Sequence, residues 1–215
     1  MAKTIGSAGE RDIALVRHYW PLELRPAFDA LMAIADAFAD IVATSSEPAL
    51  GAIRLAWWRE ALERLDTFPA PPEPRLQAVA TELLSLGVSG KDIAAIEDGF
   101  AALLDEAPDA DRVVASGAAM FACAAKLLGA EDKRLPEAGG LYAVSRAVRL
   151  GFMAYPEKEG PGSLVGHRFA RSLRPLTALA RLAARDFKNG TEIETEATPG
   201  RAIALLSHRM VGTIA

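Results

Sequence analysis

The sequence predicts an all-α protein, a single helical domain over residues 1–215. Alanine and leucine recur at helical spacing along nearly the whole chain, and runs of alternating β-branched residues are missing. Hydrophobic residues make up 51% of the 215 residues, and no long polar tract interrupts them. A chain of this length and composition can bury a substantial core, so one bundle of helices is expected.

Proline, glycine and capping residues mark the expected limits of the helices. The second helix follows Pro21, and "SSEP" places a serine cap before Glu47 and Pro48 in the first turn of the third helix. Ser89 and Asp92 can form a capping box at the start of the fifth helix. We expect helices at residues 9–19, 22–45, 47–66, 74–86, 90–107, 110–128, 135–154, 164–187 and 199–213.

The connections between these helices have the composition of loops. Residues 68–75 and 155–166 are rich in proline and glycine, and the polar segment 188–200 is expected to be a flexible loop before the last helix. Cys123 lies in an apolar, helix-like run. It has no partner for a disulfide and no neighbouring histidine, so we expect it to be a packing residue.

The balance of charge argues against a nucleic-acid-binding protein. The chain has 24 basic and 28 acidic residues and shows no basic stripe. The N-terminal "MAKTIGSAGERD" lacks the apolar run of a secretion signal, and no apolar run reaches the ~20 residues that span a bilayer. We therefore expect a cytoplasmic protein with no transmembrane segment, and we keep peripheral contact with the inner membrane open.

The stretch "DAFAD" places Asp36 and Asp40 four residues apart on the second helix. Carboxylates at this spacing share one helix face, and D-x-x-x-D is a pattern with which all-helical enzymes hold magnesium against a diphosphate. An alanine-rich surface helix also carries acids at this spacing simply to stay soluble. Positions 36, 39, 40 and 43 share one quadrant of the helix, so both acids face whatever that quadrant faces.

The third helix carries "IRLAWWREALERL", in which the adjacent Trp57 and Trp58 cannot both point in one direction. One of them is expected near the boundary between core and solvent, and the simplest interpretation uses both only as core. Arg54 and Arg59 lie on the polar side. Arg59 and Glu63 form an i, i+4 pair that is worth roughly a few tenths of a kcal/mol.

Two consecutive segments, "WPLELRPAFDALMAIADAFADIV" and "EPALGAIRLAWWREALERL", resemble the N-terminal region of the squalene/phytoene synthase family, the head-to-head prenyl synthases. The similarity is weaker over 112–129 and is visible again in "AGGLYAVSRAVRLG" (138–151). The resemblance implies the all-α isoprenoid synthase fold, in which helices 22–45 and 135–154 face each other across a central cavity. Because the chain is shorter than typical members, the resemblance also implies a reduced C-terminal layer.

The first acidic motif of active family members falls on the second helix. It has the form A-L-Y-A-F-x-R-x-x-D-D-x-x-D and aligns without a gap on "ALMAIADAFADIVA". Asp36 takes the place of the family's arginine, and Asp40 matches one aspartate. Ala39 and Ala43 stand where the first and last metal-binding aspartates would be. The "DAFAD" pair is therefore one helical turn out of register with the motif.

The second acidic motif of active members reads roughly Q-L-x-N-x-x-R-D-x-x-x-D. Here "YAVSRAVRLGFMA" keeps the arginine as Arg149 but has Leu150 and Ala154 in place of the aspartates. In the family, magnesium ions held by both acidic motifs neutralise the departing pyrophosphate. Alanine and leucine have no oxygen with which to coordinate magnesium, so the resemblance implies a site without its metal ligands.

A branch of this family shows the same losses. It includes the mitochondrial assembly factor of respiratory complex I and bacterial relatives, and it keeps the pattern E-P-x-L-G-x-I-R-L-x-W-W-R-x-A. The chain matches this pattern over residues 47–61. The resemblance implies a partner-binding surface formed by the signature residues Glu47, Trp57, Trp58 and Arg59.

Two functions follow from the resemblance. The first is a catalytically degenerate protein that acts as a binding or respiratory-complex-assembly factor, with a protein partner or a prenyl lipid in the central cavity and no cofactor. The alternative is a head-to-head prenyltransferase of isoprenoid biosynthesis that uses Mg and prenyl diphosphates. In that case Asp36 and Asp40, together with Asp29, would be substitute metal ligands.

Three arginines are candidates for binding a diphosphate or another anion through bidentate contacts: Arg25, Arg54 and Arg149. Pairing with Asp or Glu on helix surfaces explains them equally well. The histidines are not at metal-ligand spacing, so surface or capping positions are expected for them. They are His18, His167 and His208.

Overall fold

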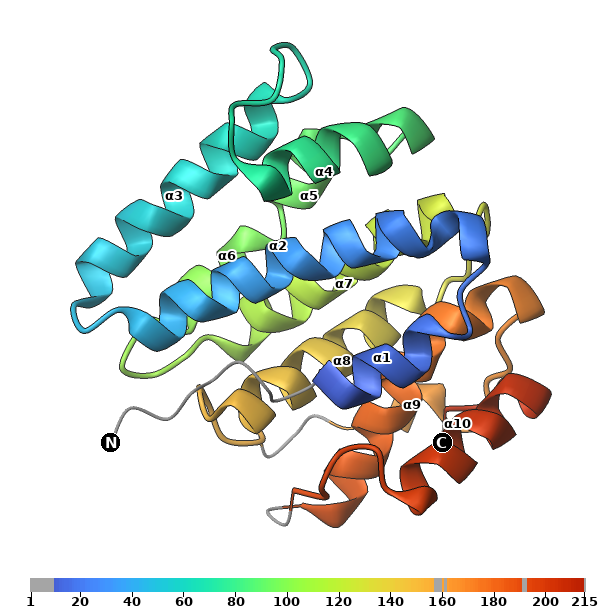
Figure 1. Ribbon diagram of the computed structural model, residues 1–215. Helices are drawn as coiled ribbons and strands as arrows, with labels where there is room; N and C mark the ends of the chain where they lie inside the picture. The colour runs from blue at the N-terminus through green and yellow to red at the C-terminus, as the bar shows by residue number, and fades with distance from the viewer. Residues whose placement is uncertain (1–9, 157–159, 161, 191–192, 215) are drawn as a thin grey trace.

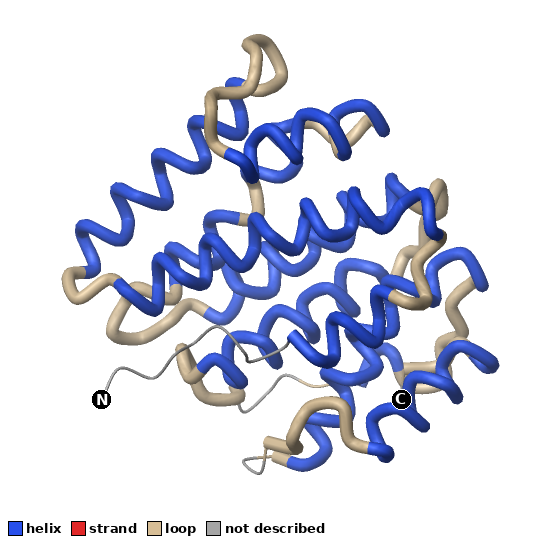
Figure 2. Tube along the Cα trace, viewed as in Figure 1, coloured by secondary structure: helices blue, strands red, loops and turns tan. Residues whose placement is uncertain are grey.

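The computed structural model describes residues 10–156, 160, 162–190 and 193–214. These residues form an all-α bundle, as the sequence predicts (Figure 2). The only β-type pairing among them is an isolated antiparallel bridge between Arg168 and Thr213. None of the described helices combines the length and the apolar character needed to cross a bilayer.

The helices follow one another along the chain, and the connection between α8 and α9 is longer than the others. The α-helices of the described chain are α1 (Glu10–Arg17), α2 (Arg25–Thr44), α3 (Pro48–Arg64), α4 (Pro74–Glu82), α5 (Gly90–Ala94), α6 (Glu97–Ala102), α7 (Ala110–Leu127), α8 (Leu135–Leu150), α9 (Arg174–Asn189) and α10 (Pro199–Val211). Short 3-10 turns lie at Leu22–Leu24, Leu84–Leu86, Gly162–Leu164 and Arg171–Leu173.

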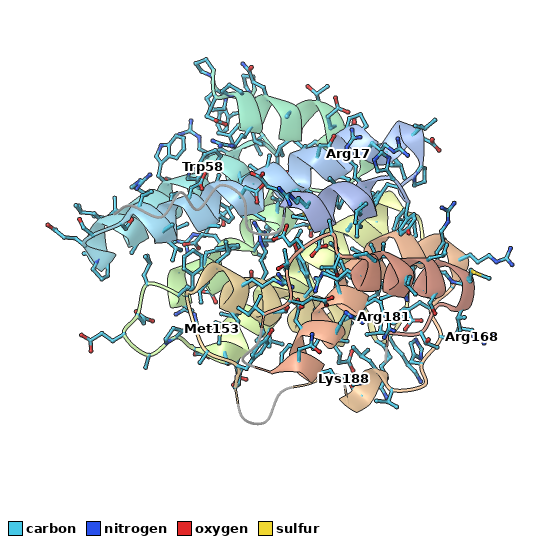
Figure 3. The ribbon with its side chains drawn as sticks, turned by 60° about the horizontal axis from the view of Figure 1, so that its bottom comes forward. Arg17, Trp58, Met153, Arg168, Arg181 and Lys188 are labelled. Carbon is cyan, nitrogen blue, oxygen red and sulfur yellow. The ribbon has the colours of Figure 1, made fainter. Side chains whose placement is uncertain are left out.

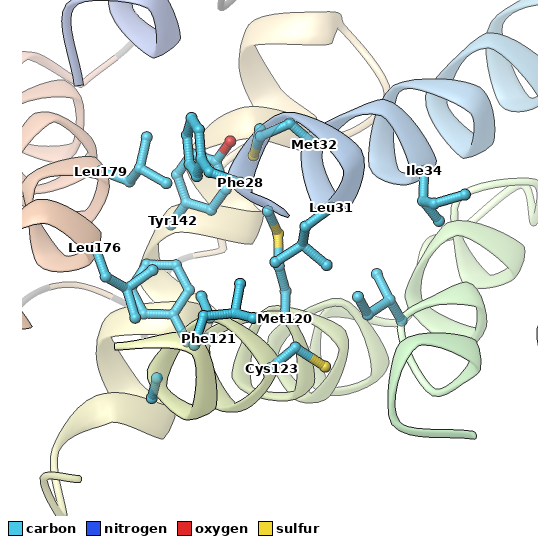
Figure 4. Close-up of a cluster of buried hydrophobic side chains, with 14 of the residues drawn as sticks. Phe28, Leu31, Met32, Ile34, Met120, Phe121, Cys123, Tyr142, Leu176 and Leu179 are labelled. Atoms are coloured by element: carbon cyan, nitrogen blue, oxygen red, sulfur yellow. The ribbon is translucent and has the colours of Figure 1, made fainter. Parts of the chain in front are cut away.

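Helix α2 runs through the middle of the molecule (Figure 1). Helices α3, α4 and α5 lie on one side of it and α8, α9 and α10 on the other, while α7 packs against α8. Phe28 and Leu31 of α2 meet Phe121 of α7, Tyr142 of α8 and Leu176 of α9 in one buried core (Figure 4). The core therefore joins the N-terminal and C-terminal halves of the bundle.

Helices α7 and α8 approach each other closely at two glycines. A Cβ built on Gly139 would lie 2.3 Å from the carbonyl oxygen of Gly117, and a Cβ on Gly117 would lie 2.2 Å from the carbonyl oxygen of Gly139. The opposing atoms belong to the backbone, so no side-chain rotation can relieve such a contact. Only glycine permits the two backbones to come this near.

Several predicted helices have different limits in the structure; the expected helix 74–86, for example, ends at Glu82 and is followed by a 3-10 turn at Leu84–Leu86. The expected helix 90–107 is divided into α5, which packs mainly on α3, and α6, which packs mainly on α7 and also contacts α3. Helix α8 ends at Leu150 rather than at residue 154, since Gly151 takes a φ of 78° and caps it. Helix α9 begins at Arg174 rather than at residue 164, with a proline in its first turn.

The two predicted caps have different outcomes. At α5, the N–H of Asp92 donates to Ser89 Oγ at 3.1 Å and the N–H of Ser89 donates to Asp92 Oδ2 at 3.0 Å, which confirms the capping box. The serine cap expected for the third helix is wrong. Glu47 is the N-cap of α3, its side chain makes no capping hydrogen bond, and Pro48 begins the helix.

The segment 188–200, expected to be a flexible loop, includes the end of α9 and the start of α10. Residues 191–192 lie outside the described residues. The carbonyl of Glu194 accepts a hydrogen bond from α8 at 2.9 Å, and the N–H of Ala197 donates to Asp12 of α1 at 3.0 Å. The described part of this segment is therefore in contact with both α8 and α1.

Cys123 lies inside the core on α7, as expected for a packing residue. Burial raises the pKa of its thiol to about 12. The thiol is therefore protonated at neutral pH and lacks the thiolate character of a nucleophile.

Candidate functional site

The acids predicted as metal ligands lie along the solvent side of α2. Asp36 Oδ1 accepts a hydrogen bond from Nη2 of Arg146 on α8 at 2.5 Å, and Asp40 is exposed. Asp29 pairs with Arg17, whose Nε lies 2.6 Å from Oδ1. Two of the three acids are thus held by different arginines. Among the described residues, no group of three or more His, Cys, Asp or Glu side chains could hold a metal ion.

The ion pair between Asp36 and Arg146 links the two helices that carry the motif segments. Val42 of α2 also packs against a buried cluster that includes Val144 and Ala147 of α8. The Arg146 side chain is 10% exposed, whereas that of Asp36 is 53% exposed. The negative charge that could attract a magnesium ion is therefore already engaged by a guanidinium that is nearly buried.

An apolar pocket lies beside this ion pair, between α6, α7 and α8. Arg146 is the one charged side chain among the described residues that line it, and Phe100, Met120 and Leu150 are among its apolar ones. Leu150 stands where active family members have an aspartate, whereas Ala154 lies beyond the end of α8. The pocket suits an apolar group and offers no oxygen ligand set for magnesium.

A buried ionic network lies against α8 and is centred on Asp186 of α9. Nε and Nη2 of Arg149 donate hydrogen bonds to the two carboxylate oxygens of Asp186, and each donor–acceptor distance is 2.6 Å. Arg201 of α10 contacts the same carboxylate at 2.5 Å, and Ser145 Oγ donates to it at 3.0 Å. Because Asp186 and Arg201 are both buried, each charge depends on the presence of the others.

The network continues to α1 and to the segment before α10. Nη2 of Arg201 lies 2.7 Å from Oδ2 of Asp12. Glu194 accepts hydrogen bonds from Arg185 and from Thr198 Oγ1, and the bond from Arg185 is the main cause that lowers the pKa of its carboxyl group. Three arginines thus face three carboxylates. We call this set the ionic network: Asp12, Arg149, Arg185, Asp186, Glu194 and Arg201.

Sequence reasoning placed Arg149 but missed its partner Asp186. A signal was present, because Asp186 falls on the apolar face of α9, three residues after Ala183. Arg201 likewise lies on the buried face of α10. A charge on a buried face requires a buried partner, but the sequence does not say which residue that partner is.

The three candidate arginines are not brought together at one site. Nε and Nη2 of Arg25 donate to the carbonyls of Trp20 and His18, at 3.2 and 3.0 Å. Arg54 contacts the hydroxyl of Thr44 at 3.4 Å. Arg25 therefore holds the connection between α1 and α2, and Arg54 lies at the corner between α2 and α3, while Arg149 belongs to the ionic network.

The N-terminal half of the chain, which contains α2 and α3, has a recognisable relative. Residues 7–112 match the family model of squalene/phytoene synthase. Over this segment the chain is similar to squalene/phytoene synthase. The match covers just under half of the 215 residues and ends at the start of α7, so it includes α2 and α3 but not α8. No curated protein and no solved structure matches the chain.

The signature residues of the matched segment divide between the two sides of α3. Trp58 is buried and packs edge-on against Phe38, with ring centroids 6.3 Å apart. Trp57 is 50% exposed, and Glu47 at the start of the helix is exposed as well. We define the outer face of α3 as the exposed apolar side chains Leu50, Ile53 and Trp57 of the helix together with Phe68, which follows its end and lines a pocket with Trp57.

Arg59 has a partner that its sequence neighbours do not suggest. Its Nη1 lies 3.7 Å from Oε2 of Glu97, at the N-terminus of α6, instead of forming the expected pair with Glu63. The Glu97 side chain is 5% exposed and that of Arg59 is 53% exposed. Burial raises the pKa of Glu97, and the positive charge of Arg59 opposes this shift.

The histidines occupy three different environments, none of them a metal site in the described part of the chain. His18 is exposed, and His167 Nε2 lies 2.9 Å from a carboxylate oxygen of Asp132. His208 differs from the expected surface or capping position, because it is buried on the inner face of α10. Its Nδ1 donates to the carbonyl of Thr213 at 2.8 Å and its Nε2 faces the hydroxyl of Thr177 at 2.9 Å.

Proposed function

We propose that this squalene/phytoene synthase-like protein is catalytically degenerate and acts as a binding factor, of the kind that assists the assembly of a respiratory complex. The observation that carries the proposal is the chemistry at the motif positions. The residues there are Ala39, Ala43, Leu150 and Ala154. Joining two prenyl diphosphates requires metal ions that neutralise the leaving pyrophosphate, and these side chains cannot hold them.

The remaining charges support the same proposal. Asp36 would have to leave Arg146 before it could bind magnesium, and Arg149 would have to leave Asp186 before it could bind a diphosphate. The second exchange would leave a buried carboxylate without one of its counter-charges, which is costly. The small apolar pocket beside Arg146 has no carboxylate among the described residues that line it, so it offers no ligands for a metal-bound diphosphate.

The outer face of α3 supports a protein partner. Tryptophan is frequent among the residues that dominate binding energy at interfaces, and contiguous exposed apolar side chains mark interaction sites. The guanidinium of Arg64 lies over the ring of Phe68 at 5.2 Å, so a cation borders the apolar side chains. We assign the partner interface to this face, with Trp57 as its centre and Arg59 beside it.

A turnover assay tests the catalytic part of the proposal. The protein is incubated with farnesyl or geranylgeranyl diphosphate and magnesium, next to an active family member as positive control. We expect neither a prenyl product nor pyrophosphate release. The family match favours a second candidate, the head-to-head prenyltransferase, in which Asp36 and Asp40 hold Mg. Product that disappears in the double variant Asp36→Asn, Asp40→Asn would establish that candidate instead.

A cross-linking experiment tests the binding part. A photoreactive group placed at Ile53 should capture a discrete protein in extract of the native cells, and Trp57→Ser should abolish the capture. Leu86→Ser is the matched control, because Leu86 is also an exposed apolar residue but lies outside α3. Equal capture by the protein and by Trp57→Ser would contradict the assignment of the interface.

A further inference from the structure

The C-terminal part of the chain is basic although the whole chain carries a net charge of −4. Residues 162–190 contain six basic residues and one acid, Asp186. Three of the arginines, at positions 168, 171 and 174, are spaced three residues apart around the start of α9. The expectation of no basic stripe, drawn from total composition, therefore does not hold for the folded surface.

Arg171 and Arg174 line a groove together with Arg209 of α10, and Arg168 lies close enough for its charge to affect Arg174. The backbone of Arg168 pairs with Thr213 just after α10, and Arg168 lies on the α9 and α10 side of the molecule, away from Trp58 (Figure 3). Burial, followed by the nearby charges of Arg171 and Arg168, lowers the pKa of Arg174. The groove is lined by Tyr19, Pro21, Arg171, Ser172, Arg174, Pro175, Arg209 and Met210.

The charges of this groove are uncompensated, unlike those of the ionic network. In the described part of the chain, no carboxylate forms an ion pair with any of the four arginines. Arg174 donates hydrogen bonds to the carbonyls of Arg209 and Met210, and each donor–acceptor distance is 2.9 Å. The guanidinium group of Arg209 lies over the ring of Tyr19, 5.0 Å from its centroid. Carbonyls orient the guanidinium group of Arg174 and an aromatic ring that of Arg209, but neither contact neutralises the charge.

An exposed apolar stripe continues from the groove along α10. Ile203, Leu206 and Met210 are 67%, 54% and 72% exposed, and their spacing of three and four residues places them on one face of the helix. Met210 also lines the groove, so the stripe and the arginines are continuous. Leu22, which follows Pro21 in the chain, is 74% exposed.

We infer that this combined surface docks the protein on a membrane that contains anionic phospholipids. We call it the basic face and define it as Arg168, Arg171, Arg174 and Arg209 with Ile203, Leu206 and Met210. A helix that buries apolar side chains at the lipid interface, flanked by arginines that contact anionic headgroups, binds membranes through two forces that add. The charge of this surface indicates which partner binds there, because uncompensated arginines beside an apolar stripe require a partner that is both anionic and apolar.

Vesicle flotation tests the basic face on the whole chain. The protein should float with vesicles of phosphatidylcholine and phosphatidylglycerol, bind pure phosphatidylcholine vesicles weakly, and be released by added salt. Replacing Arg171 and Arg209 by Ala should weaken binding by about thirtyfold at low salt, since each arginine near an anionic surface contributes on the order of fivefold. Leu206→Ser with Met210→Ser should weaken binding at every salt concentration.

The control removes the same charge elsewhere. Lys91→Ala with Arg75→Ala takes two exposed cations from α4 and α5, and it should leave flotation unchanged. Circular dichroism and the melting temperature establish that each variant is folded. Equal binding to neutral vesicles, or an equal loss in the control pair, would overturn the inference. Binding to single-stranded RNA but not to vesicles would assign the arginines to nucleic acid and would overturn it as well.

Discussion

Arg59 and Glu97 form an ion pair in which only the arginine reaches solvent. The carboxylate lies at the N-terminus of α6, where the helix dipole also favours a negative charge. Burial raises the pKa of Glu97 and Arg59 lowers it, so the arginine helps to keep a buried carboxylate ionised. Arg59 therefore stabilises the fold in addition to the part we assign it in partner binding.

Arg59→Ala should lower the free energy of unfolding by about 1–2 kcal/mol, between the values for an exposed and for a fully buried pair. The loss should shrink as the pH falls, because Glu97 then becomes neutral and no longer needs a counter-charge. Urea unfolding of the single variants and of the double variant with Glu97→Gln measures this coupling. If Arg59→Ala costs the same with and without the Glu97→Gln change, the pair contributes nothing.

His208 gives the stability a dependence on pH near neutrality. Burial is the main cause that lowers the pKa of His208 from 6.5, and the nearby Arg181 and Arg174 lower it further. Since the unfolded chain binds the proton at a higher pH than the folded one, the free energy of unfolding should fall as the pH drops below about 6.5, by at most about 1.4 kcal/mol per pH unit. Urea unfolding at several pH values measures the slope. His208→Gln should flatten it, and identical slopes in both proteins would contradict the prediction.

Local contacts of single residues could be predicted from the sequence, and distant ones could not. Ser89 and Asp92 cap α5 as expected because both partners lie within one turn. Glu97 could not be assigned to Arg59, since only the packing of α3 on α6 brings them together. The adjacent tryptophans required opposite environments on geometric grounds, but which of them is buried depends on where the core lies.

At the scale of elements, the crossing of α7 and α8 depends on two glycines. Gly139→Ala should lower the free energy of unfolding by at least about 2 kcal/mol, because the new methyl group would meet the backbone of α7 and force the helices apart. Without a clash, alanine would stabilise the helix relative to glycine by about 1 kcal/mol. A decrease in the free energy of unfolding would therefore indicate the clash. Gly162→Ala, where an added Cβ meets nothing within 4 Å, is the control. Thermal unfolding compares the two, and equal stability would contradict the close approach.

The helices themselves could be predicted because alanine and leucine recur at their period, and the differences lie at ends that tertiary contacts decide. Gly151 is a typical C-cap residue and could have been used to end the predicted helix 135–154 at residue 150. The division of 90–107 into α5 and α6 has no glycine or proline at the break to signal it, and both short helices pack on α3 and α7. Helix ends that depend on distant partners are not encoded in the local pattern.

At the scale of the whole molecule, the ionic network joins α1, α8, α9 and α10. Asp186→Asn should lower the free energy of unfolding by about 3–5 kcal/mol, because Arg149 and Arg201 would stay buried without their shared counter-charge. Asp29→Asn makes the same chemical change in the exposed pair with Arg17 and should cost less than about 1 kcal/mol. Chemical denaturation of both variants measures the difference, and equal losses would show that burial does not strengthen the network.

The candidate site could be predicted in its composition but not in its connections. The alignment of "DAFAD" with the family motif identified positions 36 to 43 and the loss of acids there, because that information lies in one helix. The partners of Asp36 and Arg149 lie 110 and 37 residues away along the chain. Pairing over such separations depends on how the helices pack, which a single sequence leaves open.

The ionic network also has a consequence for biosynthesis. The carboxylate of Asp12 accepts a hydrogen bond from the N–H of Ala197, 185 positions later in the chain, and also contacts Arg201. While the ribosome is still making the chain, α1 and α8 exist without the helix that supplies this arginine, and the bundle cannot yet enclose its charges. The final packing step must therefore wait until α10 leaves the exit tunnel. During that interval the nascent bundle is exposed to proteases and chaperones, and variants that weaken the network should prolong this exposure.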